Sequence, residues 1–300
     1  MKNLVTVIIP TYNREHTICQ AIDSVLQQTY DQIEVIVVDD CSQDATQKVV
    51  EESYRTDNRV RYERLPQNSG ACVARNRGID LSLGNYLAFL DSDDVYYPEK
   101  IALQLDAMRN SNSDLCATSF MRVLADGKKE RKLVFPGTKD EIYQNLLYCN
   151  FITTGTLIGK RECFEQIRFD EALPRYQDWD ISLRLCKQYN ICLLNVDTLK
   201  QIHQEVSITN STGHQKTLYA LECLYEKHQT SYCSNPKANT QINWLMGIHS
   251  MYGGEKRQYN RLWIGVRGDG FNMKRCLIFL IMCLHLERIF EAKILLFDNK

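Results

Sequence analysis

Acidic residues follow one apolar segment of the chain directly. Residues 86–90 have the sequence YLAFL, and Asp91-Ser92-Asp93-Asp94 comes next. Three carboxylates within four residues repel one another unless a positive charge lies among them. Carboxylate oxygens are the ligands that Mg²⁺ and Mn²⁺ prefer, and such an ion can stabilise a diphosphate leaving group. The run therefore predicts a divalent cation site, and the alternative is a solvated acidic turn.

Two further groups of residues suit phosphate or nucleoside chemistry. Asp39-Asp40 follows an apolar segment, where a carboxylate can accept a hydrogen bond from a uracil N–H or a ribose hydroxyl; the alternative is a turn cap. Asn68-Ser69-Gly70 precedes Ala74-Arg75-Asn76 at the start of a predicted helix. Glycine permits close backbone approach, and a helix N-terminus favours anions. For Arg75 the alternative is a surface ion pair.

Strands and helices alternate over the first 110 residues. Apolar runs predict strands at 4–10, 33–38 and 86–90, and residues 60–65 are predicted as a further strand. Helical patterns occupy 16–28, 44–54, 70–81 and 98–109. This order indicates a mostly parallel sheet with helices on both faces, whose ligands bind outside the carboxyl ends of the strands. Acidic residues follow the carboxyl ends of two of these predicted strands, at Asp39-Asp40 and at 91–94. This arrangement predicts that the protein binds a nucleotide together with a metal ion.

The rest of the chain has weaker patterns. They predict a strand at 115–124, a turn at Asp126-Gly127, a helix at 139–148, a short strand at 156–158, a short helix at 178–188 and helices from 213 onward.

The composition narrows the class of protein. The chain has 300 residues, 44% of them hydrophobic, which excludes a disordered or low-complexity protein. A formal net charge of −1 argues against a nucleic-acid partner. Twelve cysteines without a C-x-x-C pair predict reduced thiols, and with no signal peptide in view we expect a cytoplasmic protein.

Four motifs in this order resemble the family 2 glycosyltransferases. They are VIIPTYN at 7–13, VVDDCSQD at 37–44, Asn68-x-Gly70 with Ala74-Arg75-Asn76, and LDSDD at 90–94. The resemblance covers residues 4–210 and implies the GT-A fold, a nucleotide-diphosphate sugar donor and inversion at the anomeric carbon. We therefore expect a catalytic domain at 1–210 and a helical region at 211–300.

The resemblance also implies roles for individual residues. Tyr12 would lie near the base, Asp40 would bind uracil with Asp39 beside it, and Asp91 would touch the ribose or donor sugar. Asp93 would bind Mn²⁺ or Mg²⁺, and Asp94 would orient its neighbours. The full nucleotide-sugar set comprises Pro10, Thr11, Tyr12, Asp39, Asp40, Asn68, Gly70, Arg75, Asp91 and Ser92. Family members often have glycine where Cys41 stands, so that turn is expected to differ slightly.

The catalytic base is predicted in Gln177-Asp178-Trp179-Asp180, which resembles the family's acidic pair before a short helix. The first place is often Glu, and here it is Gln, which leaves Asp178 as the general base; its alternative role is an N-cap. Asp180 is the second candidate, and Trp179 would shape the acceptor pocket or pack in the core. His203 would bind the metal or the diphosphate, with a structural role as its alternative.

The C-terminal end differs from the rest in charge. Residues 255–300 contain nine basic and five acidic residues. The apolar run 276–284 is too short to span a bilayer. It suits a peripheral contact with the membrane interface, and the alternative is a helix packed on the catalytic domain or on a second copy in a homodimer.

Together these observations predict an inverting, metal-dependent glycosyltransferase. It would move a hexose or N-acetylhexosamine from a UDP-sugar to a glycan or polyprenyl-diphosphate-linked acceptor in O-antigen or capsule synthesis, at the inner face of the cytoplasmic membrane. Two other classes stay open. A nucleotidyltransferase would show an early glycine-rich signature, and a non-catalytic sugar-binding module would have lost Asp93 or Asp178.

Overall fold

The computed structural model of the chain describes residues 3–202, 213–253, 258–268 and 273–283. Contacts divide the chain into two compact units. The first comprises residues 1–146, 150–172 and 177–207, and the second comprises 147–149, 173–176 and 208–300. The predicted domain boundary between residues 210 and 211 lies outside the described residues.

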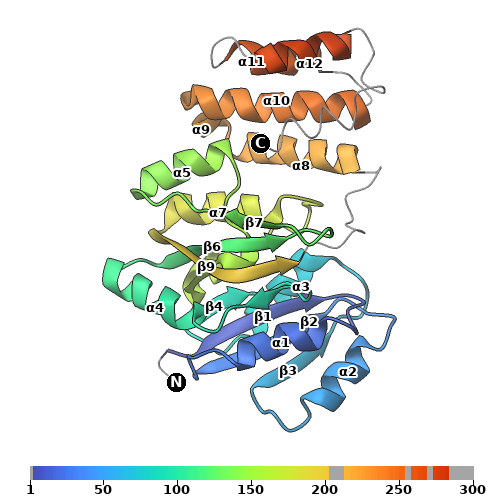
Figure 1. The fold of residues 1–300 in the computed structure, drawn as a ribbon, viewed down its shortest axis with the longest axis vertical. Coiled ribbons are helices and arrows are strands. Elements are labelled where there is room, and N and C mark those ends of the chain that lie inside the picture. The colour runs from blue at the N-terminus through green and yellow to red at the C-terminus, as the bar shows by residue number, and fades with distance from the viewer. Residues whose placement is uncertain (1–2, 203–212, 254–257, 269–272, 284–300) are drawn as a thin grey trace. The chain divides into compact units, whose positions relative to one another are not determined.

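A mixed, nine-stranded sheet forms the core of the first unit (Figure 1). Its strands are β1 (Val5–Thr11), β2 (Ile33–Asp39), β3 (Val60–Arg64), β4 (Tyr86–Phe89), β5 (Val95–Tyr96), β6 (Leu115–Val123), β7 (Lys129–Lys132), β8 (Ile158–Lys160) and β9 (Ile191–Ile202). The order is β3-β2-β1-β4-β8-β6-β9-β5, with β7 paired to β6. Every residue of β1 and β2 is buried, which explains why their apolar runs do not alternate with polar residues.

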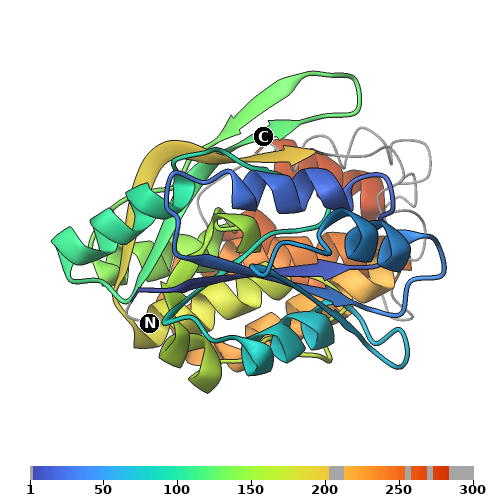
Figure 2. The same cartoon turned by 90° about the horizontal axis from the view of Figure 1, so that it is seen from below.

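Helices cover both faces of this sheet. They are α1 (Ile18–Leu26), α2 (Thr46–Ser53), α3 (Ala71–Leu81), α4 (Lys100–Ser111), α5 (Lys139–Tyr148), α6 (Arg161–Gln166) and α7 (Gln177–Gln188), with a 3₁₀ turn at Thr154–Thr156. Figure 2 shows α1 and α3 on opposite faces of the central strands. The predicted fold class, a mostly parallel sheet flanked by helices with further helices at the C-terminal end, is confirmed.

The direction of the chain across the sheet reverses between β1 and β4. Strands β1, β2 and β3 follow one another outward, whereas α3 carries the chain back across the other face to β4 on the far side of β1. The parallel register pairs Thr11 with Asp39 and Ile8 with Phe89. The segments that follow β1, β2 and β4 therefore meet at one edge, beside the reversal point where open α/β sheets bind ligands.

The structure corrects several sequence predictions in the less regular half. Strands β5, β7 and β9 and helix α6 were not predicted, and the strand predicted at 156–158 is a 3₁₀ turn followed by β8. β8 is antiparallel to both of its neighbours, so the sheet is not parallel throughout. The helix predicted at 178–188 is present as α7, which runs for twelve residues from Gln177 to Gln188. Its helical period is weak in the sequence because α7 is buried around most of its circumference.

The second unit is helical. Its main elements are α8 (Gly213–Lys227), α9 (Gln229–Ser234), α10 (Pro236–Gly253), α11 (Tyr259–Arg267) and α12 (Met273–Cys283). Side chains of α10, α11 and α12 form an apolar core around Trp244, Leu262 and Met282. Among the described residues, no helix is long and apolar enough to cross a bilayer.

Candidate active site

Hydrogen bonds join the two loops that follow β1 and β2. The amide of Asn13 donates to Ser42 Oγ at 2.8 Å, and the amide of Gln43 donates to Asn13 Oδ1 at 2.7 Å. The amide of Arg14 donates to Thr46 Oγ1, also at 2.8 Å. Asn13 adopts a positive φ of 53°, which asparagine tolerates better than most residues. The loops therefore form one rigid rim at the edge of the sheet.

The two consecutive aspartates at the end of β2 are buried and hold different segments. Asp39 accepts hydrogen bonds from the amide and hydroxyl of Ser42 at 2.9 and 2.6 Å, and from the Tyr62 hydroxyl. Asp40 accepts from the amides of Ser69 and Gly70 at 2.6 and 2.7 Å. Asp39 therefore positions its own loop, and Asp40 positions the amino-terminal end of α3.

The remaining residues of the predicted donor pocket lie around this rim. Pro10 and Thr11 are buried at the end of β1, whereas Tyr12 and Asn68 are exposed. The hydroxyl oxygen of Thr11 is buried without a hydrogen-bond partner. A ligand atom can supply such a partner. Gly70 has a φ of +94° with open space around it, so conformation is what requires glycine there.

Cys41 takes the left-handed backbone conformation that its side chain disfavours. Its φ is +66°, so the turn keeps the geometry that glycine adopts most easily. A left-handed non-glycine residue costs roughly 1–2 kcal/mol. Glycine removes this cost but has more conformational entropy in the unfolded chain, which offsets part of the gain. We therefore expect Cys41→Gly to raise the free energy of unfolding, measured by urea denaturation, by about 1 kcal/mol.

The matched control for this variant is Cys233→Gly. Cys233 is exposed within helix α9, where glycine is expected to lower stability by about 1 kcal/mol. Equal destabilisation by both variants would show that the turn at Cys41 is not strained.

Arg75 links three parts of the first unit. It is only 6% exposed, so the surface ion pair considered from the sequence is excluded. Its Nη2 donates to Asp91 Oδ1 at 2.7 Å, and its Nη1 donates to Gln177 Oε1 at 3.1 Å. The guanidinium carbon lies 5.3 Å from the ring centroid of Phe169. Arg75 therefore ties the acidic turn after β4 to the first residue of α7.

The acidic turn concentrates negative charge. Asp93 Oδ2 lies 3.5 Å from Arg14 Nη2, and Asp94 Oδ1 accepts the amide of Ile202 at 2.9 Å. Burial raises the pKa of Asp94 well above its usual range, and the charges of Asp91 and Asp93 raise it further. Ser92 is buried within the turn. The sequence alternative of a fully solvated turn is therefore wrong.

This donor set fits a divalent cation that shares its ligands with a substrate. The described residues contain no cluster of three or more His, Cys, Asp or Glu side chains able to enclose a metal. Mg²⁺ is commonly held by one or two carboxylates together with substrate phosphates and water. Arg75 and Arg14 already offset part of the charge of Asp91 and Asp93, and a divalent cation at this turn would add positive charge beside the same carboxylates. His203, the other predicted ligand, lies outside the described residues.

Asp178 lies in the first turn of α7 and not at its N-cap, because the helix begins at Gln177. Its Oδ2 accepts from Asn150 Nδ2 at 3.0 Å, and its Oδ1 accepts the amide of Trp179 at 2.9 Å. Burial raises the pKa of Asp178, although these two hydrogen bonds and the charge of Arg75 oppose the rise. A raised pKa suits a carboxylate that must accept a proton near neutral pH.

The two residues after Asp178 are buried more deeply. Trp179 donates its indole N–H to the carbonyl of Leu146 at 2.6 Å. Asp180 is fully buried and accepts from Arg184 Nε at 2.9 Å, four residues further along the helix. Of these three residues, Asp178 is therefore the least buried.

The hydrogen bond from Asn150 leads to a test of pH dependence. This bond lowers the pKa of Asp178, so its removal in Asn150→Ala raises that pKa further. If the ionised carboxylate is the base, the acidic limb of the kcat/KM profile shifts to higher pH. Asn145→Ala, at an exposed position of α5, is the control. An unmoved limb in Asn150→Ala would contradict the role of Asp178.

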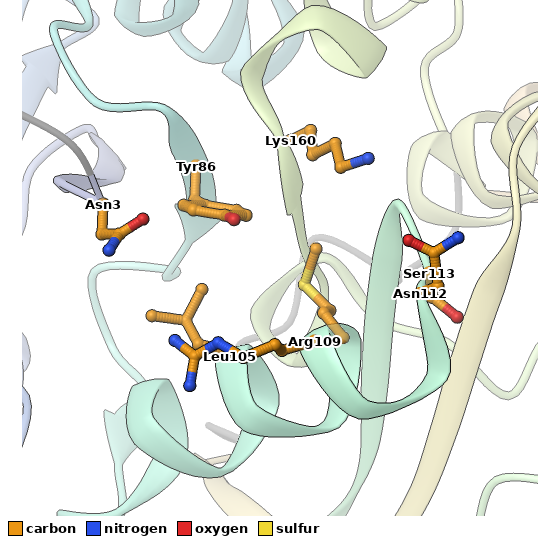
Figure 3. A pocket seen from close by; sticks show the side chains of 8 residues that line it. Asn3, Tyr86, Leu105, Arg109, Asn112, Ser113 and Lys160 are labelled. Carbon is orange, nitrogen blue, oxygen red and sulfur yellow. The ribbon is translucent and has the colours of Figure 1, made fainter.

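A separate pocket of about 240 Å³ lies at the opposite edge of the sheet (Figure 3). Asn3, which precedes β1, and Tyr86, the first residue of β4, line it together with Lys160. Lys160 Nζ lies 2.7 Å from Asp114 Oδ1. The pocket contains none of the predicted site residues, whereas the predicted donor residues lie at the rim formed by the carboxyl ends of the strands.

Sequence reasoning missed three contributors to this site. Arg14 faces Asp93, Asn150 binds Asp178, and Gln177 binds Arg75. Gln177 was noted only for replacing the more usual Glu. Only the folded chain brings these residues to their partners.

The curated relatives of this chain are glycosyltransferases. A chain segment is 34% identical over 187 residues to the Putative teichuronic acid biosynthesis glycosyltransferase TuaG of Bacillus subtilis, covering 62% of this chain and 73% of TuaG. The chain is also 33% identical over 193 residues to a second relative, the UDP-Glc:alpha-D-GlcNAc-diphosphoundecaprenol beta-1,3-glucosyltransferase WfgD of Escherichia coli. This match covers 64% of this chain and 73% of WfgD. The chain also matches an Uncharacterized glycosyltransferase of Rickettsia felis, but spans only 31% of its length.

Solved structures show the same fold. S. aureus TarS 1-349 in complex with UDP-GlcNAc superposes with a TM-score of 0.61 at 20% identity, covering 95% of this chain and 88% of TarS. The mannosyltransferase PcManGT of Pyrobaculum calidifontis, in complex with GDP-Man and Mn²⁺, superposes with a TM-score of 0.58 at 16% identity. The match covers 98% of this chain and 84% of PcManGT. The profile of the family described as Glycosyl transferase family 2 matches residues 6–168. This chain therefore belongs to glycosyl transferase family 2.

Proposed function

We propose that this protein transfers a hexose or N-acetylhexosamine from a UDP-sugar to a hydroxyl of a glycan or polyprenyl-diphosphate-linked glycan. The names of WfgD and TuaG support a lipid-linked acceptor and a role in bacterial surface polysaccharide synthesis, such as O-antigen or capsule. The UDP-GlcNAc complex of TarS is consistent with a uridine nucleotide. The enzyme would work at the cytoplasmic face of the membrane.

One observation carries this proposal. Arg75 joins Asp91 of the acidic turn to Gln177, the residue before Asp178, through hydrogen bonds of 2.7 and 3.1 Å. One buried side chain thus connects the turn that we propose to bind the diphosphate to the residue next to the candidate base. A glycosyl transfer needs these two groups on either side of the same sugar carbon.

The donor would lie on the rim at the ends of β1 and β2. Thr11, with its unpartnered hydroxyl, and the exposed Tyr12 would contact the uridine beside Pro10. Asp40 keeps the Asn68–Gly70 segment in place. Asp39 supports that rim from below, as its contacts with Ser42 and Tyr62 indicate.

The acidic turn and the first turn of α7 would perform the reaction. Asp178 takes the proton from the acceptor hydroxyl while the oxygen attacks the anomeric carbon from the face opposite the diphosphate. The bond from that carbon to the diphosphate oxygen breaks in the same displacement, so one step inverts the configuration. A divalent cation at Asp93, with Asp91 nearby, supplies positive charge for the diphosphate when bound.

A panel of UDP-sugars tests this function. The full chain is incubated with each donor, with and without Mn²⁺, and UDP release is measured in the absence and presence of polyprenyl-diphosphate-linked glycans. We expect slow hydrolysis of one donor and faster UDP release with an acceptor. Pyrophosphate release from a sugar phosphate and a nucleoside triphosphate would instead indicate a nucleotidyltransferase, and tight donor binding without turnover would indicate a sugar-binding module.

A further inference from the structure

The outer faces of α11 and α12 expose large apolar side chains. Trp263, Ile264, Met273, Leu277 and Leu280 are between 40% and 74% exposed. Figure 1 shows both helices as the outer layer of the second unit, beyond α10. Single exposed apolar residues are ordinary, but a cluster on two neighbouring helices marks an interaction surface. We call these five residues the α11–α12 surface.

Helix α12 has a second apolar face that is already buried. Ile278 and Met282 pack in the core of the unit with Leu262 of α11. Met273, Leu277 and Leu280 are spaced by four and three residues, so they share the opposite side of the helix. A helix with apolar side chains on two opposite faces normally has both of those faces covered. The exposed side of α12 therefore suits an apolar medium rather than water.

The charge of these helices is entirely positive. Helices α11 and α12 contain Arg261, Arg267, Lys274 and Arg275 and no acidic residue. Arg267 and Lys274 are exposed beside the apolar side chains. The Arg267 guanidinium lies 5.3 Å from the ring centroid of Trp263, which lies 5.5 Å from that of Phe279.

We infer that the α11–α12 surface binds an anionic lipid membrane. Tryptophan and long basic side chains concentrate at the level of lipid headgroups, and leucine and methionine enter the acyl region beneath them. A second copy of this chain is a poorer occupant, because it would bring the same positive charges together. The inference extends the proposed function, in that a polyprenyl-linked acceptor is held in the bilayer that this surface would contact.

Vesicle binding by the full chain, without donor or acceptor, tests the inference independently of glycosyl transfer. Vesicles of phosphatidylcholine, alone or mixed with phosphatidylglycerol, are sedimented with the protein. We expect binding to the anionic vesicles that weakens with salt, together with a blue shift in tryptophan emission. Trp263 reports contact, because Trp179 and Trp244 are buried.

Two double variants separate the apolar and electrostatic contributions. Leu277→Ser/Leu280→Ser is expected to weaken binding about tenfold or more through lost apolar burial. Arg267→Glu/Lys274→Glu is expected to weaken binding to anionic vesicles by about tenfold or more, with retention of the fold checked by circular dichroism. Leu83→Ser, at a residue that is 62% exposed in the first unit, is the control and should bind like the parent chain.

Four results would overturn the inference. The first is equal binding to neutral and anionic vesicles, and the second is unchanged binding by both double variants. The third is a dimer, detected by light scattering, that Leu277→Ser/Leu280→Ser dissociates while the parent chain ignores vesicles. That outcome would assign the surface to a second copy. The fourth is a parent chain that does not bind vesicles but transfers sugar normally to a soluble acceptor. That result would reject the membrane inference and leave the proposed glycosyl transfer intact.

Discussion

Asp178→Asn is expected to lower kcat about 10²–10⁴-fold, the range that a positioned general base contributes. The amide keeps the shape of the side chain and can still accept the Trp179 amide hydrogen bond, but it loses the hydrogen bond from Asn150 Nδ2, so the fold should be retained with a modest loss of stability. It cannot take the acceptor proton. Steady-state transfer from the UDP-sugar identified in the donor panel measures the loss, and donor KM should change little.

Asp180→Asn is the matched control, because it removes the neighbouring carboxylate. Asp180 is buried and paired with Arg184, so its replacement is expected to lower the thermal midpoint of unfolding and leave the chemical step largely intact. If Asp180→Asn removed transfer while Asp178→Asn retained it, the base would be Asp180.

Asp93→Ala is expected to lower kcat/KM by roughly 10²–10³-fold, the cost of removing one group that stabilises developing charge. The variant should also lose the Mn²⁺ dependence of UDP binding, measured by calorimetry with and without the metal. This second readout needs no turnover. It therefore distinguishes a lost metal ligand from a general loss of activity.

Asp126→Ala is the control for this variant. Asp126 lies in the exposed turn between β6 and β7 and pairs with Lys128 at 2.5 Å, so its removal should leave UDP binding unchanged. Asp93 also pairs with Arg14, and Arg14→Ala tests whether that contact alone matters. Metal-enhanced UDP binding that survives in Asp93→Ala would falsify the assignment of Asp93.

The acidic residues at the strand ends could be predicted because their cause is local. An apolar, β-branched run forms a buried strand, and the next polar residues must lie just beyond its end. Asp39, Asp40 and Asp91 were located in this way, and the reversal of chain direction beside β1 brings their segments to one edge. Their individual roles in donor binding stay predictions.

Other features could not be predicted because the determining contacts are distant in the chain. Arg75 and Gln177 are 102 residues apart, and Asn150 and Asp178 are 28 apart. Strand β8 has only three residues, and its antiparallel direction depends on the strands beside it. No sequence period records which side chains will meet across such separations.

The strand–helix alternation of the first 110 residues, the four motifs and hence the expected glycosyltransferase class could be predicted from the amino-acid sequence. Each follows from neighbouring residues, whose periodicity and turn chemistry act locally. The burial of Arg75, the deeper burial of Asp180 than of Asp178 and the second, exposed apolar face of α12 could be seen only in the folded chain. Burial and pairing are properties of packing, because they depend on which distant side chains exclude water from a given group.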